Sequence, residues 1–145
     1  MNDPSASSRP TPGSLRALVV DDEPISQKIL KALLAPLGGC DVASNGKEAL
    51  EIFAEAVKRR TPYRLVCLDI TLPDVDGRAV LTKIRAIERA AGVNGPERAK
   101  VIMTTASEDR QDIVVSFRAE CDAYLIKPIG KDALMWRLSS LGLHS

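Results

Sequence analysis

The sequence has almost no excess of charge of either sign. Its 145 residues include 20 lysines and arginines and 19 aspartates and glutamates, which leaves a net charge of +1. Proteins that bind nucleic acids or anionic membranes usually carry a clear basic excess. We therefore expect neither a nucleic acid nor a membrane surface among the partners of this chain.

Cysteines and long apolar runs are also scarce. The three cysteines, Cys40, Cys67 and Cys121, are odd in number, and no pair has the spacing of zinc ligands. We interpret them as small buried apolar residues in a reducing compartment. The sequence has no run of about 18 apolar residues and no N-terminal segment typical of a signal peptide. These absences predict a cytoplasmic location.

The length fits one domain. Apolar residues make up 45% of the chain and charged residues 27%, which is ordinary for a globular protein. Residues 1–14 are rich in proline and serine and predict a disordered tail. We expect residues 15–145 to form a single folded domain.

Beyond the tail, apolar runs alternate with amphipathic segments. Short apolar runs predict strands at Leu15–Val20, Cys40–Ala43, Leu65–Leu68, Val101–Thr104 and Ala123–Ile126. Helical spacing predicts helices after Pro24, after Asn45, and at Gly77–Ala91, Ile113–Phe117 and Lys131–Leu141. Five strands that alternate with five helices indicate an α/β fold, a doubly wound parallel sheet with helices on both faces.

Apolar stripes show which helix faces are expected to be buried. The first helix carries Ile25, Ile29, Leu30, Leu33 and Leu37 at helical spacing. The last helix turns Leu134, Leu138 and Leu141 inward, which directs Trp136, the only tryptophan, outward. Exposed aromatic residues are enriched in protein contacts, so Trp136 is a candidate for a partner surface. The alternative is that Trp136 lies flat against a neighbouring helix as a packing residue.

Polar residues follow four of the predicted strands directly. Asp21–Asp22 follow the first strand, Asp69 the third, and Lys127–Pro128 the fifth, while the fourth runs into Thr104–Thr105. The carboxyl ends of parallel strands meet at one edge of a sheet, where ligands bind in such folds. Each residue taken alone could be an ordinary turn or surface residue, but together they predict one site.

The chemistry of this set favours phosphoryl transfer. Three clustered carboxylates repel one another unless a cation offsets their charge, and oxygen ligands favour Mg²⁺ over zinc. Lys127 adds a further positive charge. A carboxylate, a hard metal, a hydroxyl and a lysine suit phosphoryl transfer, and Asp69 can act as the nucleophile that forms an aspartyl phosphate.

Four segments carry a family resemblance. They are LVVDDE (Leu18–Glu23), LDITLPDVDG (Leu68–Gly77), MTTAS (Met103–Ser107) and YLIKP (Tyr124–Pro128). In this order the chain resembles the receiver domain of two-component response regulators, over Leu15 to about Leu141. The resemblance implies a flavodoxin-like sheet with strand order 2-1-3-4-5, and it identifies residues 15–145 as the receiver domain.

The resemblance also implies a metal site. Asp69 would accept the phosphoryl group and would bind Mg²⁺. Asp22 would bind the ion directly, and Asp21 largely through water. The backbone carbonyl of Thr71 would be a further ligand.

The remaining implied roles concern the phosphoryl group and its signal. Thr105 would contact the phosphoryl group, and Lys127 would pair with it. Tyr124 would change rotamer together with Thr105 as a switch. The Lys127–Pro128 bond would be cis.

The chain departs from compact receivers in two places. The family often has methionine where this chain has Leu72 and Val75, and both changes keep apolar bulk. The stretch from Ile87 to Lys100 is longer by roughly half a dozen residues, which is consistent with a tolerated surface insertion. This longer segment is similar to receivers attached to hybrid histidine kinases.

The expected function is a signalling module rather than a turnover enzyme. It would accept phosphate from a histidine kinase or a histidine phosphotransfer protein, with only self-catalysed phosphoryl transfer and autodephosphorylation. Output would pass to a downstream protein, and a homodimer is possible. One alternative is a Mg²⁺-dependent phosphohydrolase with an aspartate nucleophile, although Thr71 replaces the second carboxylate that such enzymes use. The other is a pseudo-receiver scaffold that works without phosphorylation.

Overall fold

The computed structural model describes residues 15–106 and 121–143. Its strands are β1 (Ala17–Val20), β2 (Cys40–Ala43), β3 (Leu65–Asp69), β4 (Lys100–Thr105) and β5 (Ala123–Ile126). Its helices are α2 (Pro24–Leu34), α3 (Gly46–Lys58), α4 (Gly77–Ala90) and α6 (Lys131–Ser140), with 3-10 turns η1 (Ala35–Leu37) and η2 (Gly95–Glu97). The predicted tail at 1–14 and the predicted helix Ile113–Phe117 lie outside the described residues.

The five strands form one parallel sheet in the order β2-β1-β3-β4-β5, which confirms the predicted fold class. One register row crosses the whole sheet through Ala43, Val20, Leu68, Met103 and Tyr124. Because the strands run in the same direction, residues just beyond this row lie along the same edge. The carboxyl ends of the strands therefore meet, as the sequence predicts.

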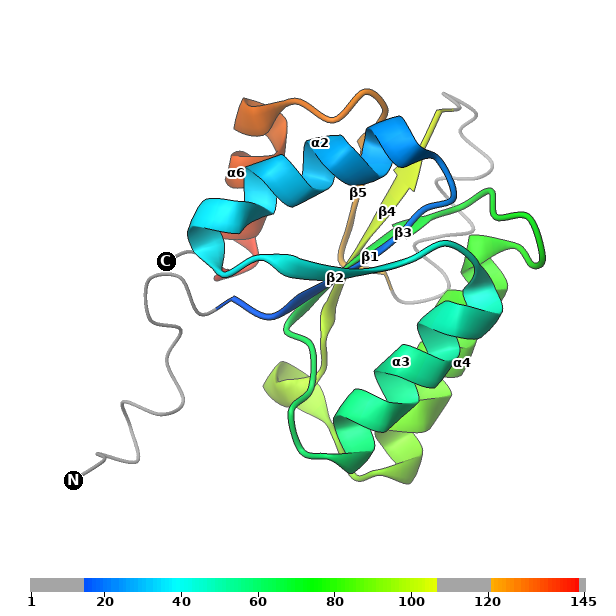
Figure 1. Ribbon diagram of the computed structural model, residues 1–145. Helices are drawn as coiled ribbons and strands as arrows, with labels where there is room; N and C mark the ends of the chain where they lie inside the picture. The colour runs from blue at the N-terminus through cyan, green and yellow to red at the C-terminus, as the bar shows by residue number, and fades with distance from the viewer. Residues whose placement is uncertain (1–14, 107–120, 144–145) are drawn as a thin grey trace.

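Helices cover both faces of the sheet. In Figure 1, α2 and α6 lie on one side and α3 and α4 on the other. Side chains of β1 alternate between the two: Leu18 and Val20 belong to the core under α3 and α4, while Ala17 and Val19 belong to the core under α2 and α6. Strands buried on both faces explain the continuous apolar runs in the sequence.

Local signals in the sequence set several helix starts. The Asn45 side chain accepts a hydrogen bond from Glu48 N–H (2.8 Å), and Glu48 in turn accepts one from Ser44 N–H (3.0 Å). Pro24 occupies the first turn of α2, where a missing N–H costs nothing.

The predicted burial was wrong at Ile25 and incomplete elsewhere. Ile29, Leu33 and Leu37 are only half-buried, and so is Cys40, which was expected to be buried. Ile25, in the first turn of α2, is 75% exposed. Leu141 is only half-buried, and Leu143, beyond the helix end, fills the core under α6 instead. In the described ranges, none of the helices has the length and apolarity needed to cross a membrane.

Candidate functional site

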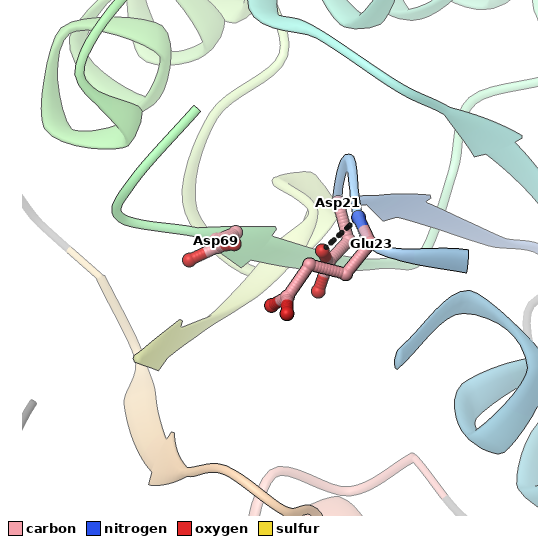
Figure 2. Close-up of side chains that lie close together, drawn as sticks. All are labelled: Asp21, Glu23 and Asp69. Atoms are coloured by element: carbon pink, nitrogen blue, oxygen red, sulfur yellow. Dashed lines mark hydrogen bonds between the residues drawn. The ribbon is translucent and has the colours of Figure 1, made fainter. Parts of the chain in front are cut away.

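The carboxyl edge of the sheet brings together acidic residues from two strand ends. Asp21 directly follows β1, Glu23 precedes α2, and Asp69 is the last residue of β3. One carboxylate oxygen from each lies within 4.8 Å of the others. Figure 2 shows the Asp21 and Glu23 side chains side by side, with the Glu23 N–H donating to Asp21 Oδ1 (2.9 Å).

Lys127 is the cation of this cluster. It follows β5, and its Nζ lies 2.8 Å from Asp21 Oδ2, 2.8 Å from Glu23 Oε1 and 2.9 Å from Asp69 Oδ2. Burial opposes the charged ammonium, but the hydrogen bonds to the three carboxylates outweigh it and raise the pKa of Lys127. Lys127 therefore stays positive at neutral pH.

Asp69 is buried yet borders open space. Burial, the largest influence, raises the pKa of the Asp69 carboxyl, and the hydrogen bonds from Lys127 and from Thr71 N–H act in the opposite direction. The Thr71 N–H donates to Asp69 Oδ1 at 3.1 Å. Any further positive charge nearby would stabilise the anionic form of a carboxylate held in this partly desolvated position.

The acidic residues differ in part from the set expected from the sequence. Asp22 is exposed and is not among the three clustered carboxylates, although it lines the same cavity. Glu23, which sequence reasoning did not select, is a member of the cluster. Its hydrogen bond with Lys127 lowers the pKa of Glu23. The segment LVVDDE contains Glu23, but nothing in the sequence shows that its side chain turns back toward Lys127.

The cluster opens into a cavity of about 440 Å³. Its lining includes Asp22, Asp69, Thr71 and Lys127. The carboxylates of Asp22, Glu23 and Asp69 line it, and carboxylate oxygens are ligands that hard divalent cations prefer. The acids also outnumber the one lysine, so the residues present fit a divalent cation.

The loop between Asp69 and α4 is held from two sides. Gly77 N–H donates to the Ile70 carbonyl (2.7 Å), and a β-carbon at Gly77 would overlap the backbone carbonyl of Asp69. Asp74 accepts hydrogen bonds from the N–H groups of Gly46 (2.8 Å) and Lys47 (2.9 Å) at the start of α3. These contacts explain why the segment after Asp69 contains aspartate and glycine at these two positions.

The residues expected to act as a switch lie at the same edge. Thr105 is buried at the end of β4, directly after Thr104, which pairs with Asp69. The Lys127 N–H donates to the Thr105 carbonyl (2.8 Å), and the Lys127–Pro128 bond is cis. Tyr124, in β5, is half-buried against the core under α3 and α4.

Trp136 lies on the outer side of α6, as the apolar stripe predicts, and is 62% exposed. The Arg137 guanidinium lies 4.9 Å from the centre of the Trp136 ring and 5.9 Å from that of the Tyr124 ring. A chain of contacts therefore joins β5 to the exposed tryptophan.

Comparisons with known proteins agree on one family. The family model described as "Response regulator receiver domain" matches residues 17–139. The Transcriptional regulatory protein AruR of Pseudomonas aeruginosa is 33% identical over 128 residues, which cover 87% of this chain and 48% of AruR. The chain thus spans about half the length of this relative.

Two solved structures have the same fold. The receiver domain of the histidine kinase CKI1 from Arabidopsis thaliana, complexed with Mg²⁺ and BeF₃⁻, has a TM-score of 0.74 and 25% identity, covering 87% of this chain and 91% of that one. A chain in the co-crystal structure of Saccharomyces cerevisiae Ypd1, a histidine phosphotransfer signaling protein, with the receiver domain of the response regulator Ssk1 has a TM-score of 0.75 and 26% identity, covering 91% of both. The fold, the acidic edge and the family match together show that this chain belongs to the response regulator receiver domains.

Proposed function

We propose that the chain accepts a phosphoryl group on Asp69 from a phosphohistidine, in a Mg²⁺-dependent reaction that it catalyses on itself. The observation that carries this proposal is the position of Asp69. It is buried at a strand end, its Oδ2 lies 2.9 Å from Lys127 Nζ, and it lines an open cavity. A nucleophile, a cation and room for a donor are thus in one place.

In the proposed step, a carboxylate oxygen of Asp69 attacks the phosphorus and forms the new P–O bond. The bond between phosphorus and the donor nitrogen or oxygen breaks, and the donor atom keeps that electron pair. Lys127 offsets the charge on the phosphoryl oxygens, and the Thr105 hydroxyl donates a hydrogen bond to one of them. Hydrolysis of the resulting acyl phosphate by water returns the Asp69 carboxylate and inorganic phosphate.

The metal would be held by the acids of the same edge. Asp22, Asp69 and the Thr71 carbonyl are the proposed ligands, with Asp21 acting largely through water. A bound Mg²⁺ supplies Lewis-acid charge neutralisation for the phosphoryl oxygens. The proposal is supported by the three carboxylates that line the cavity, those of Asp22, Glu23 and Asp69, and by the CKI1 receiver domain, which was crystallised with Mg²⁺ and BeF₃⁻.

Labelling with acetyl phosphate tests the proposal. With Mg²⁺, the parent protein should gain the mass of one phosphoryl group, and Asp69→Asn should gain none. Asp132→Asn, the same change at an exposed residue of α6, serves as the control and should label like the parent. Equal labelling of parent and Asp69→Asn would refute the assignment.

We further propose that the signal passes through protein contacts that include Trp136. A histidine kinase or phosphotransfer protein is the proposed phosphodonor, as the Ypd1–Ssk1 receiver structure suggests by likeness. The exposed Trp136 would contact either a downstream protein or a second copy of the chain. Trp136→Ala should keep acetyl phosphate labelling and weaken dimerisation or partner binding, measured by size-exclusion chromatography and pull-down. If both measurements match the parent in both phosphorylation states, Trp136 is only a surface packing residue.

The proposed place of action is the cytoplasm. Cys40, Cys67 and Cys121 are all free thiols, which fits a reducing compartment. Burial raises the pKa of Cys67 to about 12 and that of Cys121 to about 11, so both thiols stay protonated and unreactive.

A further inference from the structure

Lys127 shares its charge among three carboxylates that differ in exposure. The side chains of Asp21 and Asp69 are 1% and 5% exposed, whereas that of Glu23 is 60% exposed. The Lys127 ammonium donates hydrogen bonds to Glu23 Oε1 (2.8 Å) and Asp69 Oδ2 (2.9 Å). The buried Asp21 Oδ2 lies 2.8 Å from the same nitrogen as an ion pair but without hydrogen-bond geometry. Three carboxylate oxygens thus already surround Lys127 Nζ where a new anion would approach.

A phosphoryl group on Asp69 that pairs with Lys127 would bring further oxygens to this crowded nitrogen, so it competes with the carboxylates already there. Releasing Asp21 would leave a buried carboxylate without its cation, which is costly. Releasing Glu23 costs little, because water replaces the ammonium around an exposed side chain. Glu23 is thus the partner that a phosphoryl group displaces most readily.

The backbone of Glu23 is fixed while its side chain can turn. Its N–H donates to Asp21 Oδ1 (2.9 Å), and its carbonyl accepts from Gln27 N–H (3.0 Å) at the start of α2. Figure 2 shows the Glu23 side chain beside Asp21, with its carboxylate extending toward the side on which Asp69 lies. A rotation of the Glu23 side chain alone would free Lys127, with no change in the sheet.

We propose that Glu23 is a positioning residue that competes with the phosphoryl group for Lys127. This inference rests on the function proposed above for Asp69. Glu23 acts in two opposite ways: its contact with Lys127 occupies the lysine, which slows phosphorylation, and its negative charge favours a divalent cation. Glu23 therefore lowers the rate of phosphorylation and raises the affinity for Mg²⁺.

Glu23→Gln in the full chain tests this directly. At saturating Mg²⁺, the acetyl phosphate labelling rate should rise about two- to fivefold, the range for an exposed ion pair. The Mg²⁺ affinity, measured without any phosphodonor as the concentration that raises the melting temperature half-maximally, should fall by a similar factor. A purely structural role for Glu23 would not move the two quantities in opposite directions.

Two further variants separate the contact from the charge. Glu23→Asp keeps the charge but shortens the side chain by one methylene, so it should label as fast as Glu23→Gln while keeping the parent Mg²⁺ affinity. Glu51→Gln removes the same charge from an exposed position on α3 and should match the parent in both measurements.

The possible results are distinguishable. A labelled parent with an unchanged rate in Glu23→Gln overturns the role of Glu23 and leaves the function proposed for Asp69 intact. A fast Glu23→Gln with a parent-like Glu23→Asp also overturns it, because the long-range charge would then be the cause. Absence of label in every protein, the parent included, overturns both proposals.

Discussion

The sheet carries an ion cluster at each end, and the two are built differently. At the carboxyl end, Asp21, Glu23 and Asp69 share Lys127, their only cation among residues 15–106 and 121–143, beside a cavity of about 440 Å³. At the amino end, the side chain of Arg85 pairs with two acids and is 3% exposed. The first cluster has three acids around one lysine, and the second has two acids around one arginine.

The amino-end cluster joins α4 to the beginnings of two strands. Arg85 lies 2.8 Å from Glu88 Oε1 and 3.0 Å from Asp122 Oδ2, and it also donates to the Ala99 carbonyl (2.8 Å). The acids accept backbone hydrogen bonds at 2.7 Å, Glu88 from Ala99 N–H and Asp122 from Val101 N–H. This cluster closes the longer segment between α4 and β4.

The difference shows how similar groups serve different purposes. Buried acids that are paired with arginine and with backbone donors fix the positions of neighbouring elements. Acids in excess of the available cations, beside open space, favour the binding of a further cation. We infer that the amino-end cluster serves stability and the carboxyl-end cluster serves chemistry, and the two can be tested against each other.

The largest expected effect is at the amino end. Arg85→Met should lower the free energy of unfolding by about 3–5 kcal/mol, because it leaves two largely buried carboxylates without their cation. Urea denaturation measures this, with Arg89→Met, an exposed arginine of the same helix, as the control. Asp69 in the folded fraction should still label at low temperature. A loss below 1 kcal/mol would show that the cluster is not structural.

Mg²⁺ should act only on the carboxyl end. At a free concentration of 100 times its Kd, binding to the folded state adds about 2.7 kcal/mol of stability. Thermal melting with and without Mg²⁺ should show this gain in the parent and also in Glu88→Gln, which alters the other cluster. Asp69→Asn should lose most of the gain, and an equal gain in that variant would place the ion elsewhere.

The same substitution at the two ends should have opposite signs. Without Mg²⁺, Asp69→Asn removes one of three acids clustered around a lysine and should raise stability by roughly 0.5–2 kcal/mol, the range for a single stabilising substitution. Asp122→Asn removes one of the two carboxylates paired with Arg85 and should lower stability by about 1–3 kcal/mol. Urea denaturation of both variants measures the two changes in the free energy of unfolding. Changes of the same sign would invalidate the contrast between the clusters.

Sequence patterns predicted the sheet and most of the residues at its carboxyl edge, because strand ends fix where a residue lies. Asp21, Asp69 and Lys127 follow apolar runs directly, so their meeting required only the parallel topology. Side-chain direction was less accessible. Glu23 reaches Lys127 and Asp22 faces solvent because of the turn into α2, which no periodic pattern records.

The amino-end cluster was missed for a related reason. Arg85 and Glu88 stand three residues apart on α4, the spacing of an ordinary surface ion pair. Only the return of the chain at Ala99 and Asp122 buries them. Burial of charged residues thus depended on contacts distant in sequence, while the apolar stripe of Val80, Leu81 and Ile84 was evident from spacing alone.

The smallest expected effect concerns Asp74, which ties the loop after Asp69 to the start of α3. The hydrogen bonds from Gly46 and Lys47 N–H hold the pKa of Asp74 below its usual range. The Asp74 carboxylate therefore binds a proton more readily in the unfolded chain than in the folded one. Its contribution to folding stability is present above about pH 4 and is lost as the pH falls through its folded-state pKa. Asp74→Asn should melt slightly below the parent at pH 7, and the difference should shrink as the pH falls below about 4. Melting curves over this range, with Asp132→Asn as the control for net charge, measure the effect. A difference between Asp74→Asn and the parent that stays constant with pH would show that the ionised carboxylate contributes nothing to holding this loop.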